Sequence, residues 1–329
     1  MTATKMTRRM LVGSAAATGL AAMLPEAFAQ APAFPSKPIR LIVPRAPGGG
    51  TDILSRLLSP VLHKELGQPI VVENKPDASA VIGAELVKRA EPDGHTVLVA
   101  DNALYQNPAI IDDLPYDTLA DFAAVTMLAQ SPVILVAHPS LPAKNVKELI
   151  AYAKANPQDV NFASGGIGSS THFAGVMFNL KAGTEMLHVP FKSSGQAMTS
   201  LLGGHVKMQF GGISSARVHV EEGKLRAIAV TGTKRDPSMP NVPTFAEEGV
   251  SGVDVTSVWG VHTPAKTPMA VRQRLREAFV AAMKDPATAQ KLAELGFQVI
   301  GNTPEEHQKQ TAELVSLWLD VGKRVNLRQ

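Results

Sequence analysis

The sequence predicts an α/β fold built in two halves. Short β-branched runs alternate with segments whose apolar residues recur at helical spacing, and the alternation starts again near residue 133. The chain has 329 residues, which is enough for two domains. Apolar residues make up 45% of the chain and charged residues 19%, as in globular proteins. We therefore expect mostly parallel sheets covered by helices on both faces.

In the first half, strands and helices alternate as strand, helix, strand, helix, strand. Pro60 falls inside the first helix and is expected to kink it. The order βαβαβ is typical of parallel strands with helical crossovers. The predicted strands are 39–43, 70–72 and 96–100, and the predicted helices are 53–66 and 81–89.

The second half repeats the alternation and ends in helices. Asn145 and Glu148 form a capping-box pattern before a helix that ends near Ala155. Thr303 and Glu306 form another, with Pro304 at the first helical position. The remaining predicted strands are 133–137, 160–163, 206–210 and 227–230, and the remaining helices are 171–180, 270–284 and 287–295.

Residues 1–29 are typical of an export signal. Basic residues come first, an uncharged apolar stretch follows at 11–24, and Ala27-Phe28-Ala29 is a cleavage pattern that would leave Gln30 first. Arg8 and Arg9 also resemble a twin-arginine signal. The alternative is an uncleaved anchor. The pattern predicts a periplasmic protein, exported by the general or the twin-arginine route.

Charge and missing motifs exclude several classes of function. Without residues 1–29 the chain keeps 29 basic and 28 acidic residues, so its charge gives no reason to expect nucleic-acid binding. It has no cysteine, and its nine histidines show no paired metal-ligand spacing. We find no phosphate-binding P-loop, no complete dinucleotide fingerprint and no nucleophile elbow. The sequence therefore predicts a receptor without a metal or a cofactor, and not an enzyme.

Two glycine-rich turns are the candidates for ligand binding. They span 43–52 and 163–172, and each joins a predicted strand to the helix that follows. Glycine lets the backbone approach a ligand, and a helix N-terminus offers unpaired N–H groups at a positive dipole end. Ligands of open α/β sheets bind at the carboxyl ends of strands. We expect both turns to converge on one anion; the alternative is that their glycines serve only tight packing.

Three further side chains are expected to have supporting roles. A carboxylate at Asp52 would repel an anion, so it is expected to cap its own helix or to hold bridging waters. His172, just after the second turn, is expected to support that turn by hydrogen bonds. Trp259 is expected to pack and not to stack on a ligand.

The chain resembles the periplasmic solute-binding proteins of tripartite tricarboxylate transporters, the group known from Bordetella uptake genes. The similarity runs from about Phe34 to the C-terminus, and its specificity comes from the order of many short motifs. These include FPSKPI at 34–39, PGGGTD at 47–52, VENKP at 72–76, PDGHT at 92–96, GGIGS at 165–169 with His172, HVPFK at 188–192, LLGG at 201–204, VPTFAEEG at 242–249 and TPEE at 303–306.

The resemblance implies a type II-like periplasmic binding protein fold, with two α/β domains, a hinge and a cleft. Domain 1 would comprise 34–132 and 256–329, and domain 2 would comprise 133–255. It implies a monomer that binds a small carboxylate, such as a dicarboxylate, a tricarboxylate or an aromatic acid. The partner would be an ion-driven inner-membrane permease of one small and one large subunit. The alternatives are a sensor subunit for a membrane kinase and a periplasmic hydrolase.

By position, the resemblance carries ligand binding onto the two turns and their surroundings. Two departures stand out. The first is Arg45, at a position that usually carries an aromatic residue; it would bind a second carboxylate of the ligand or point to solvent. The second is Gly211-Gly212, which leave one wall of the site open to a bulkier ligand. The candidate ligand-binding residues are Arg45, Gly48, Gly49, Gly50, Thr51, Asp52, Ser164, Gly165, Gly168, Ser169, Ser170 and Phe191.

Overall fold

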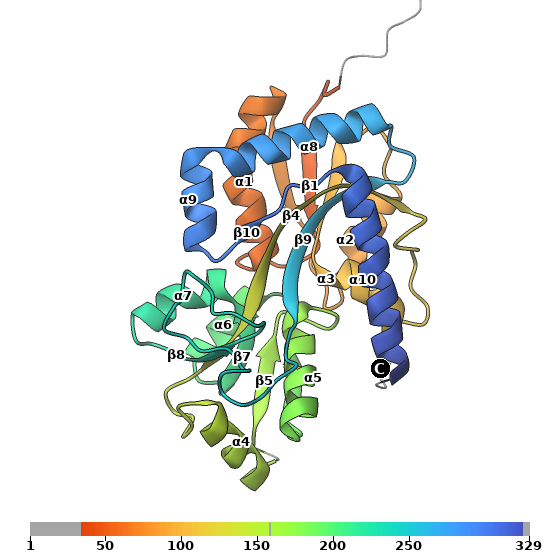
Figure 1. Cartoon of the computed structure of the whole chain (residues 1–329). Helices are drawn as coiled ribbons and strands as arrows, with labels where there is room; N and C mark the ends of the chain where they lie inside the picture. Colours follow the sequence, from red (N-terminus) through yellow and green to blue (C-terminus); the bar gives the residue numbers. More distant parts are fainter. Residues whose placement is uncertain (1–33, 158, 325–329) are drawn as a thin grey trace, which may run out of the picture. The chain divides into compact units, whose positions relative to one another are not determined.

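The strands form two sheet regions that share one long strand (Figure 1). The computed structural model describes residues 34–157 and 159–324, so the predicted export signal lies outside the described residues. The first sheet region contains β1 (Ile39–Val43), β2 (Ile70–Asn74), β3 (Thr96–Ala100), β9 (Thr256–Pro264) and β10 (Gln298–Val299). The second contains β5 (Asn161–Ser164), β6 (Leu187–Pro190), β7 (Met208–Gly212) and β8 (Arg226–Val230). Strand β4 (Phe122–Ala137) passes through both, and the main strand order is β2-β1-β3-β9-β4-β7-β5-β6.

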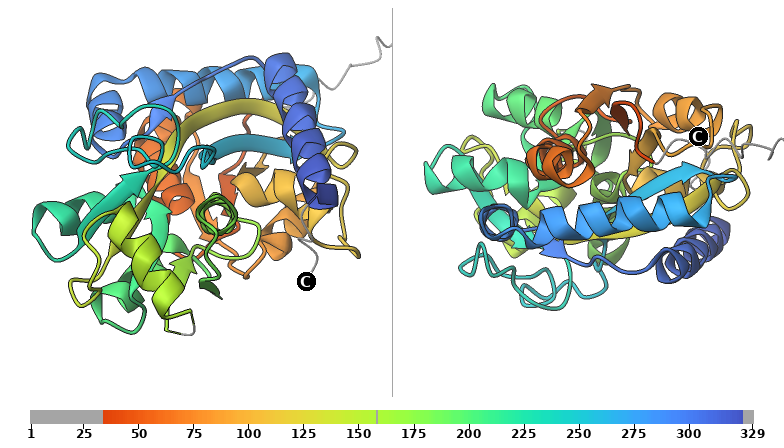
Figure 2. Two further views of the ribbon diagram at one scale, coloured as in Figure 1. Left: turned by 60° about the horizontal axis from the view of Figure 1, so that its bottom comes forward. Right: turned by 90° about the horizontal axis from the view of Figure 1, so that it is seen from above.

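Helices cover both sheet regions (Figures 1 and 2). Those of the first region are α1 (Gly50–Leu66), α2 (Val81–Lys88), α3 (Asn102–Gln106), the 3₁₀ turn η1 (Asn107–Ala109), α8 (Met269–Lys284), α9 (Pro286–Glu294) and α10 (Pro304–Arg324). Those of the second are α4 (Val146–Ala155), α5 (Ser170–Ala182), α6 (Ser194–Leu202) and α7 (Ile213–Glu221). No helix in the described ranges combines the length and the apolar character that crossing a membrane requires.

The direction of the strands corrects one expectation. β1 is parallel to β2 and β3, and β5 is parallel to β6 and β7, as predicted for strand–helix–strand units. β4, however, is antiparallel to β9, β7 and β8, and β9 is antiparallel to β3. The chain enters the second region along β4 and returns along β9, so these neighbouring strands must run in opposite directions. The middle of the sheet is therefore mixed.

Local signals located most helices correctly. The Glu148 amide donates to Asn145 Oδ1 at 2.8 Å, and the Glu306 amide donates to Thr303 Oγ1 at 3.2 Å, so both predicted capping boxes are present. Pro60 lies within α1 and does not end it. β4 begins at Phe122, well before the predicted residue 133, and β6, β9, α6 and α7 were not predicted.

Each sheet region has its own apolar core, and α10 links the two. Leu54, Val97 and Phe279 are buried in the first core, and Phe162 and Phe210 in the second. Trp318 of α10 belongs to the second core, although α10 also packs along the β4 and α3 elements of the first region. Its ring centroid lies 4.4 Å from that of Phe173 in α5. Apolar packing thus connects α10 to the helix that follows the second glycine-rich turn.

Close packing makes a glycine necessary inside α5. A Cβ atom at Gly175 would lie 2.2 Å from Phe162 Cε2, which is far below van der Waals contact. We expect Gly175→Ala to lower the free energy of unfolding by about 1–3 kcal/mol, despite the better helix propensity of alanine. Urea denaturation measures this change. Combining it with Phe162→Leu should recover part of the loss, whereas a single variant as stable as the wild type would contradict this packing.

Candidate functional site

A cavity of about 40 Å³ lies where the two sheet regions meet. That volume is enough to hold ordered water molecules beside polar groups. Its wall consists of residues at the starts of five helices, of the two glycine-rich turns and of β9. They are Arg45 and Gly165 from the turns, Gly49–Thr51 at the start of α1, Asp101 and Asn102 at the start of α3, Ser169–Thr171 at the start of α5, Ser193 and Ser194 at the start of α6, Gly212 between β7 and α7, and Ser257 and Trp259 of β9.

Four helices of nine or more residues begin at this wall: α1, α5, α6 and α7. Their N-cap residues, Gly49, Ser169, Ser193 and Gly212, all line the cavity. The first N–H groups of a helix have no partner within the helix, and each N-terminus carries roughly half a positive charge. Neither Gly49 nor Gly212 caps its helix with a side chain. The wall therefore presents donors and positive potential, which favours an anion.

The first glycine-rich turn is shaped by Asp52 and Trp259. Gly48 adopts φ +83°, a left-handed conformation that favours glycine, and its amide donates to Asp52 Oδ2 at 3.1 Å. Asp52 also accepts hydrogen bonds from Arg56 and Asn74. Its carboxylate is thus occupied by the turn and by two neighbouring side chains. The backbone amide that it accepts from belongs to Gly48, before the N-cap Gly49, so Asp52 holds the turn and does not cap the first N–H groups of α1 as expected.

Trp259 packs against the start of α1 and also forms part of the cavity wall. A Cβ atom at Gly50 would lie 2.7 Å from Trp259 Cζ2, so only glycine fits under the indole. Trp259 Nε1 donates to Thr51 Oγ1 at 3.1 Å, and the indole packs edge-on against Phe297. The predicted packing is confirmed, whereas the absence of stacking on a ligand stays a prediction, because Trp259 also lines the cavity.

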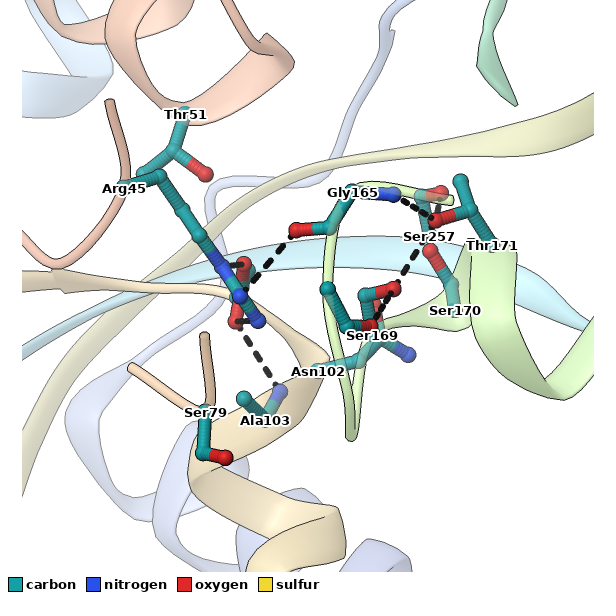
Figure 3. Close-up of polar contacts among 12 residues, drawn as sticks. Arg45, Thr51, Ser79, Asn102, Ala103, Gly165, Ser169, Ser170, Thr171 and Ser257 are labelled. Carbon is teal, nitrogen blue, oxygen red and sulfur yellow. Dashed lines mark hydrogen bonds and ion pairs between the residues drawn. The ribbon is translucent and has the colours of Figure 1, made fainter. Parts of the chain in front are cut away.

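The second turn is held by its own hydroxyl groups (Figure 3). Ser169 Oγ donates to the Gly166 carbonyl at 2.6 Å and accepts from the His172 amide at 3.2 Å. Thr171 Oγ1 accepts from the Gly165 amide at 2.9 Å. Ser170 Oγ lies 2.7 Å from Ser257 Oγ, which ties α5 to β9. These bonds fix the turn, and they use the hydroxyl protons of Ser169 and Thr171 within it.

The two turns meet, as the sequence predicted. Arg45 Nη1 donates to the Gly165 carbonyl at 3.2 Å, across 120 residues of sequence (Figure 3). The first turn also contacts the segment between β6 and α6. The Ala46 amide donates to the Lys192 carbonyl at 3.2 Å, and a Cβ atom at Gly195 of α6 would lie 2.7 Å from the Gly48 carbonyl oxygen. The turns therefore close one side of a shared cavity.

The predicted site residues divide into two groups. Lining the cavity are Arg45, Gly49, Gly50, Thr51, Gly165, Ser169 and Ser170. The others lie behind the wall: Gly48 and Asp52 bond to each other, Gly168 shapes the second turn at φ +70°, Ser164 Oγ lies 2.6 Å from His188 Nε2, and Phe191 packs on the core beside β5.

Several lining residues were not predicted. Ser193 caps α6 by accepting from the Gln196 amide at 3.2 Å, and a serine before an apolar helical pattern is a signal that the sequence does contain. Asp101 and Asn102 start the short helix α3, and Ser257 belongs to β9, and neither element was predicted. Gly212 was noted as an open wall but not as the start of a helix.

Arg45 is paired inside the protein. Its side chain is only 4% exposed, so the alternative in which it points to solvent is wrong. Nε donates to Asp101 Oδ2 at 2.6 Å, and Nη2 lies 3.4 Å from Asp101 Oδ1. Among the cavity-lining residues that the structure describes, Arg45 and Asp101 carry the side-chain charges, and these cancel.

A pair of neutral histidines lies behind the second turn. The His172 and His188 rings stack with their centroids 4.1 Å apart, and Phe162 covers the other face of His188. Burial lowers the pKa of His172 to about 4, and burial together with the neighbouring His172 lowers the pKa of His188 to about 3. The His172 ring does not line the cavity, and its Nδ1 is buried without a hydrogen-bond partner in the described part of the chain. The ring therefore supports the turn by stacking on His188, and not by the hydrogen bonds that were expected. Residues 34–157 and 159–324 contain no cluster of side chains suited to holding a metal ion.

A family model described as the tripartite tricarboxylate transporter family receptor, TctC, matches residues 54–327. The chain belongs to this family. The protein is therefore a periplasmic solute-binding protein and not an enzyme. Its fold is the two-domain fold of such proteins, as the sequence resemblance implied (Figure 1).

Relatives along most of the chain support the assignment. A UPF0065 protein from the gbd 5′ region of Cupriavidus necator is 36% identical, over 94% of this chain and 93% of its own. BugT of Bordetella pertussis is 32% identical, over 90% and 91%.

Two solved structures from Rhodopseudomonas palustris are similar to this TctC receptor. MatC with bound malate has a TM-score of 0.84 and 31% identity, covering 88% of this chain and 100% of its own. Rpa4515 with adipate has a TM-score of 0.85 and 30% identity, covering 88% and 97%.

The histidine pair makes stability depend on pH. Because the folded pKa values lie below the ordinary 6.5, the unfolded chain takes up protons first as pH falls. The stability is complete above about pH 6.5 and is lost as pH falls toward 4, by about 2 kcal/mol per ring at pH 5. Urea denaturation at pH 7.5 and pH 5 should show this loss, and the double variant His172→Gln, His188→Gln should show less of it. An equal loss in both proteins would contradict the assignment.

Proposed function

We propose that the cavity binds a small organic carboxylate, which the protein delivers to a tripartite tricarboxylate-type transporter. The supporting observation is the convergence of four helix N-termini on a wall whose side-chain charges cancel. Backbone amides and hydroxyls are then the groups that hold the anion. The ligand-binding residues are those of the two turns that line the cavity, together with the starts of α6 and α7.

The class of ligand is a dicarboxylate, a tricarboxylate or an aromatic acid. The malate and adipate of the two R. palustris structures are dicarboxylates of different length. Gly212 supports a tolerance for different lengths, because a Cβ atom there would meet only Ser214 Oγ, at 3.4 Å. The wall beside α7 is thus the place where a longer or bulkier ligand would extend.

We also propose that closure of two domains buries the ligand. Domain 1 comprises 34–132 and 256–329, domain 2 comprises 133–255, and β4 and β9 form the hinge. The register supports this division, since β4 pairs with β9 up to Pro132 and with β7 from Val133 onward. A ligand that contacts both domains would stabilise the closed conformation, so ligand binding and domain closure would be coupled.

For the cellular role, we propose export to the periplasm by the N-terminal signal, action as a monomer, and a permease of one small and one large subunit. Deleting the gene should abolish uptake of the carboxylate that co-purifies with the protein, identified by mass spectrometry. Intact uptake with lost induction of carboxylate-responsive genes would instead indicate a sensor.

A negative charge placed in the wall should block the anion. Gly212 has an ordinary backbone conformation, φ −82°, and space beside it, so Gly212→Glu and Gly212→Gln are both expected to fold. We expect Gly212→Glu to weaken carboxylate binding by roughly 100-fold or more relative to the matched Gly212→Gln, because like charges in an interface cost several kcal/mol. Calorimetry with malate, adipate, citrate and benzoate measures this. Equal affinities of the two variants would count against the assigned cavity.

A further inference from the structure

The buried ion pair of Arg45 and Asp101 lies in the wall of a cavity that otherwise favours anions. Asp101 is the N-cap of α3, where its Oδ1 accepts from the Ala103 amide at 2.9 Å. A carboxylate in such a wall repels an anionic ligand unless a cation compensates it. Arg45 supplies that cation at 2.6 Å.

The guanidinium of Arg45 is almost fully engaged by the protein. Nε and Nη2 face Asp101, and Nη1 donates both to the Ala78 carbonyl at 3.0 Å and to the Gly165 carbonyl at 3.2 Å. A guanidinium has five N–H donors, so little capacity is left for a bidentate contact with a ligand carboxylate. Arg45 also covers the negative end of the Gly165 carbonyl, which would otherwise disfavour an anion in the second turn.

We infer that Asp101 is a specificity-determining residue, because it occupies Arg45 and so withholds the cavity's guanidinium from a second ligand carboxylate. Arg45 in turn is a positioning residue: it cancels Asp101 and fixes the Gly165 turn, while amides and hydroxyls bind the ligand. The inference rests on the proposed function, since it assumes that a carboxylate occupies this cavity. It replaces the expectation that Arg45 itself reads a second carboxylate.

The sharpest test is a variant that removes the ion pair between Asp101 and Arg45 but keeps the N-cap of α3. Asparagine caps helices as well as aspartate, so Asp101→Asn keeps the bond to the Ala103 amide. Calorimetry compares two matched pairs of probes, malate with 2-hydroxybutyrate and adipate with hexanoate, in which one carboxylate becomes a methyl group. We expect Asp101→Asn to raise the preference for the dicarboxylate by roughly tenfold in at least one pair, because a charge-assisted hydrogen bond becomes available.

The complementary variant removes the cation. Arg45→Met should weaken binding of both members of each pair, by roughly tenfold or more, because Asp101 is left uncompensated in the wall. The double variant Arg45→Met, Asp101→Asn should recover the part of that affinity that the uncompensated Asp101 carboxylate costs, without the dicarboxylate preference. Recovery distinguishes a positioning role from direct contact, since an arginine that touched the ligand could not be replaced in this way. Thermal denaturation of each variant shows whether a loss of binding is instead a loss of folding.

The outcomes separate this inference from the function on which it rests. If the wild type binds carboxylates but Asp101→Asn leaves both dicarboxylate preferences unchanged, the inference is overturned and the function stands. A double variant that binds as poorly as Arg45→Met also overturns it. If neither the wild type nor Asp101→Asn binds any carboxylate probe, the proposed function fails, and the inference fails with it.

Discussion

The structure depends on one constraint: several helices begin at the same small cavity, and the N–H groups of their first turns need an acceptor. The side chains of the wall do not supply enough acceptors, because the hydroxyls mainly hold the turns and Asp101 is engaged by Arg45. The carboxylate of the proposed ligand would supply the missing acceptors. The site is therefore made of backbone, which explains why its wall is rich in glycine and serine.

The parts of the site that the sequence could predict are those encoded by local signals. Each glycine-rich turn joins a clear strand to a clear helix. Gly48 and Gly168 adopt positive φ angles, which favour glycine, so the glycines in the sequence indicate these turns directly. The capping pattern at Asn145 is equally local, because donor and acceptor lie three residues apart. Such signals do not depend on the rest of the fold, so they can be recognised before it is known.

The parts that could not be predicted depend on distant segments. Arg45 and Asp101 are separated by 56 residues, and no local sequence pattern around either residue indicates that they form an ion pair. β9 was not predicted because its sequence mixes Trp259, Gly260 and polar residues, and its burial comes from β3 and β4 on either side. The mixed direction of the sheet follows from the same fact: a chain that returns beside its own outward strand has to run antiparallel to it.

Domain closure, as proposed above, would explain how a backbone site discriminates among carboxylates. Isolated turns of amides would accept almost any anion of suitable size. In this cavity the two turns also contact each other through Arg45 and Gly165, the first turn packs on Gly195 of α6, and Trp318 packs on Phe173 of α5. A ligand that prevents these contacts would forfeit their stabilisation, even if its carboxylate were well bound. On this proposal, selectivity depends on which ligands let the protein close, and the charge balance of the Arg45–Asp101 pair is part of that condition.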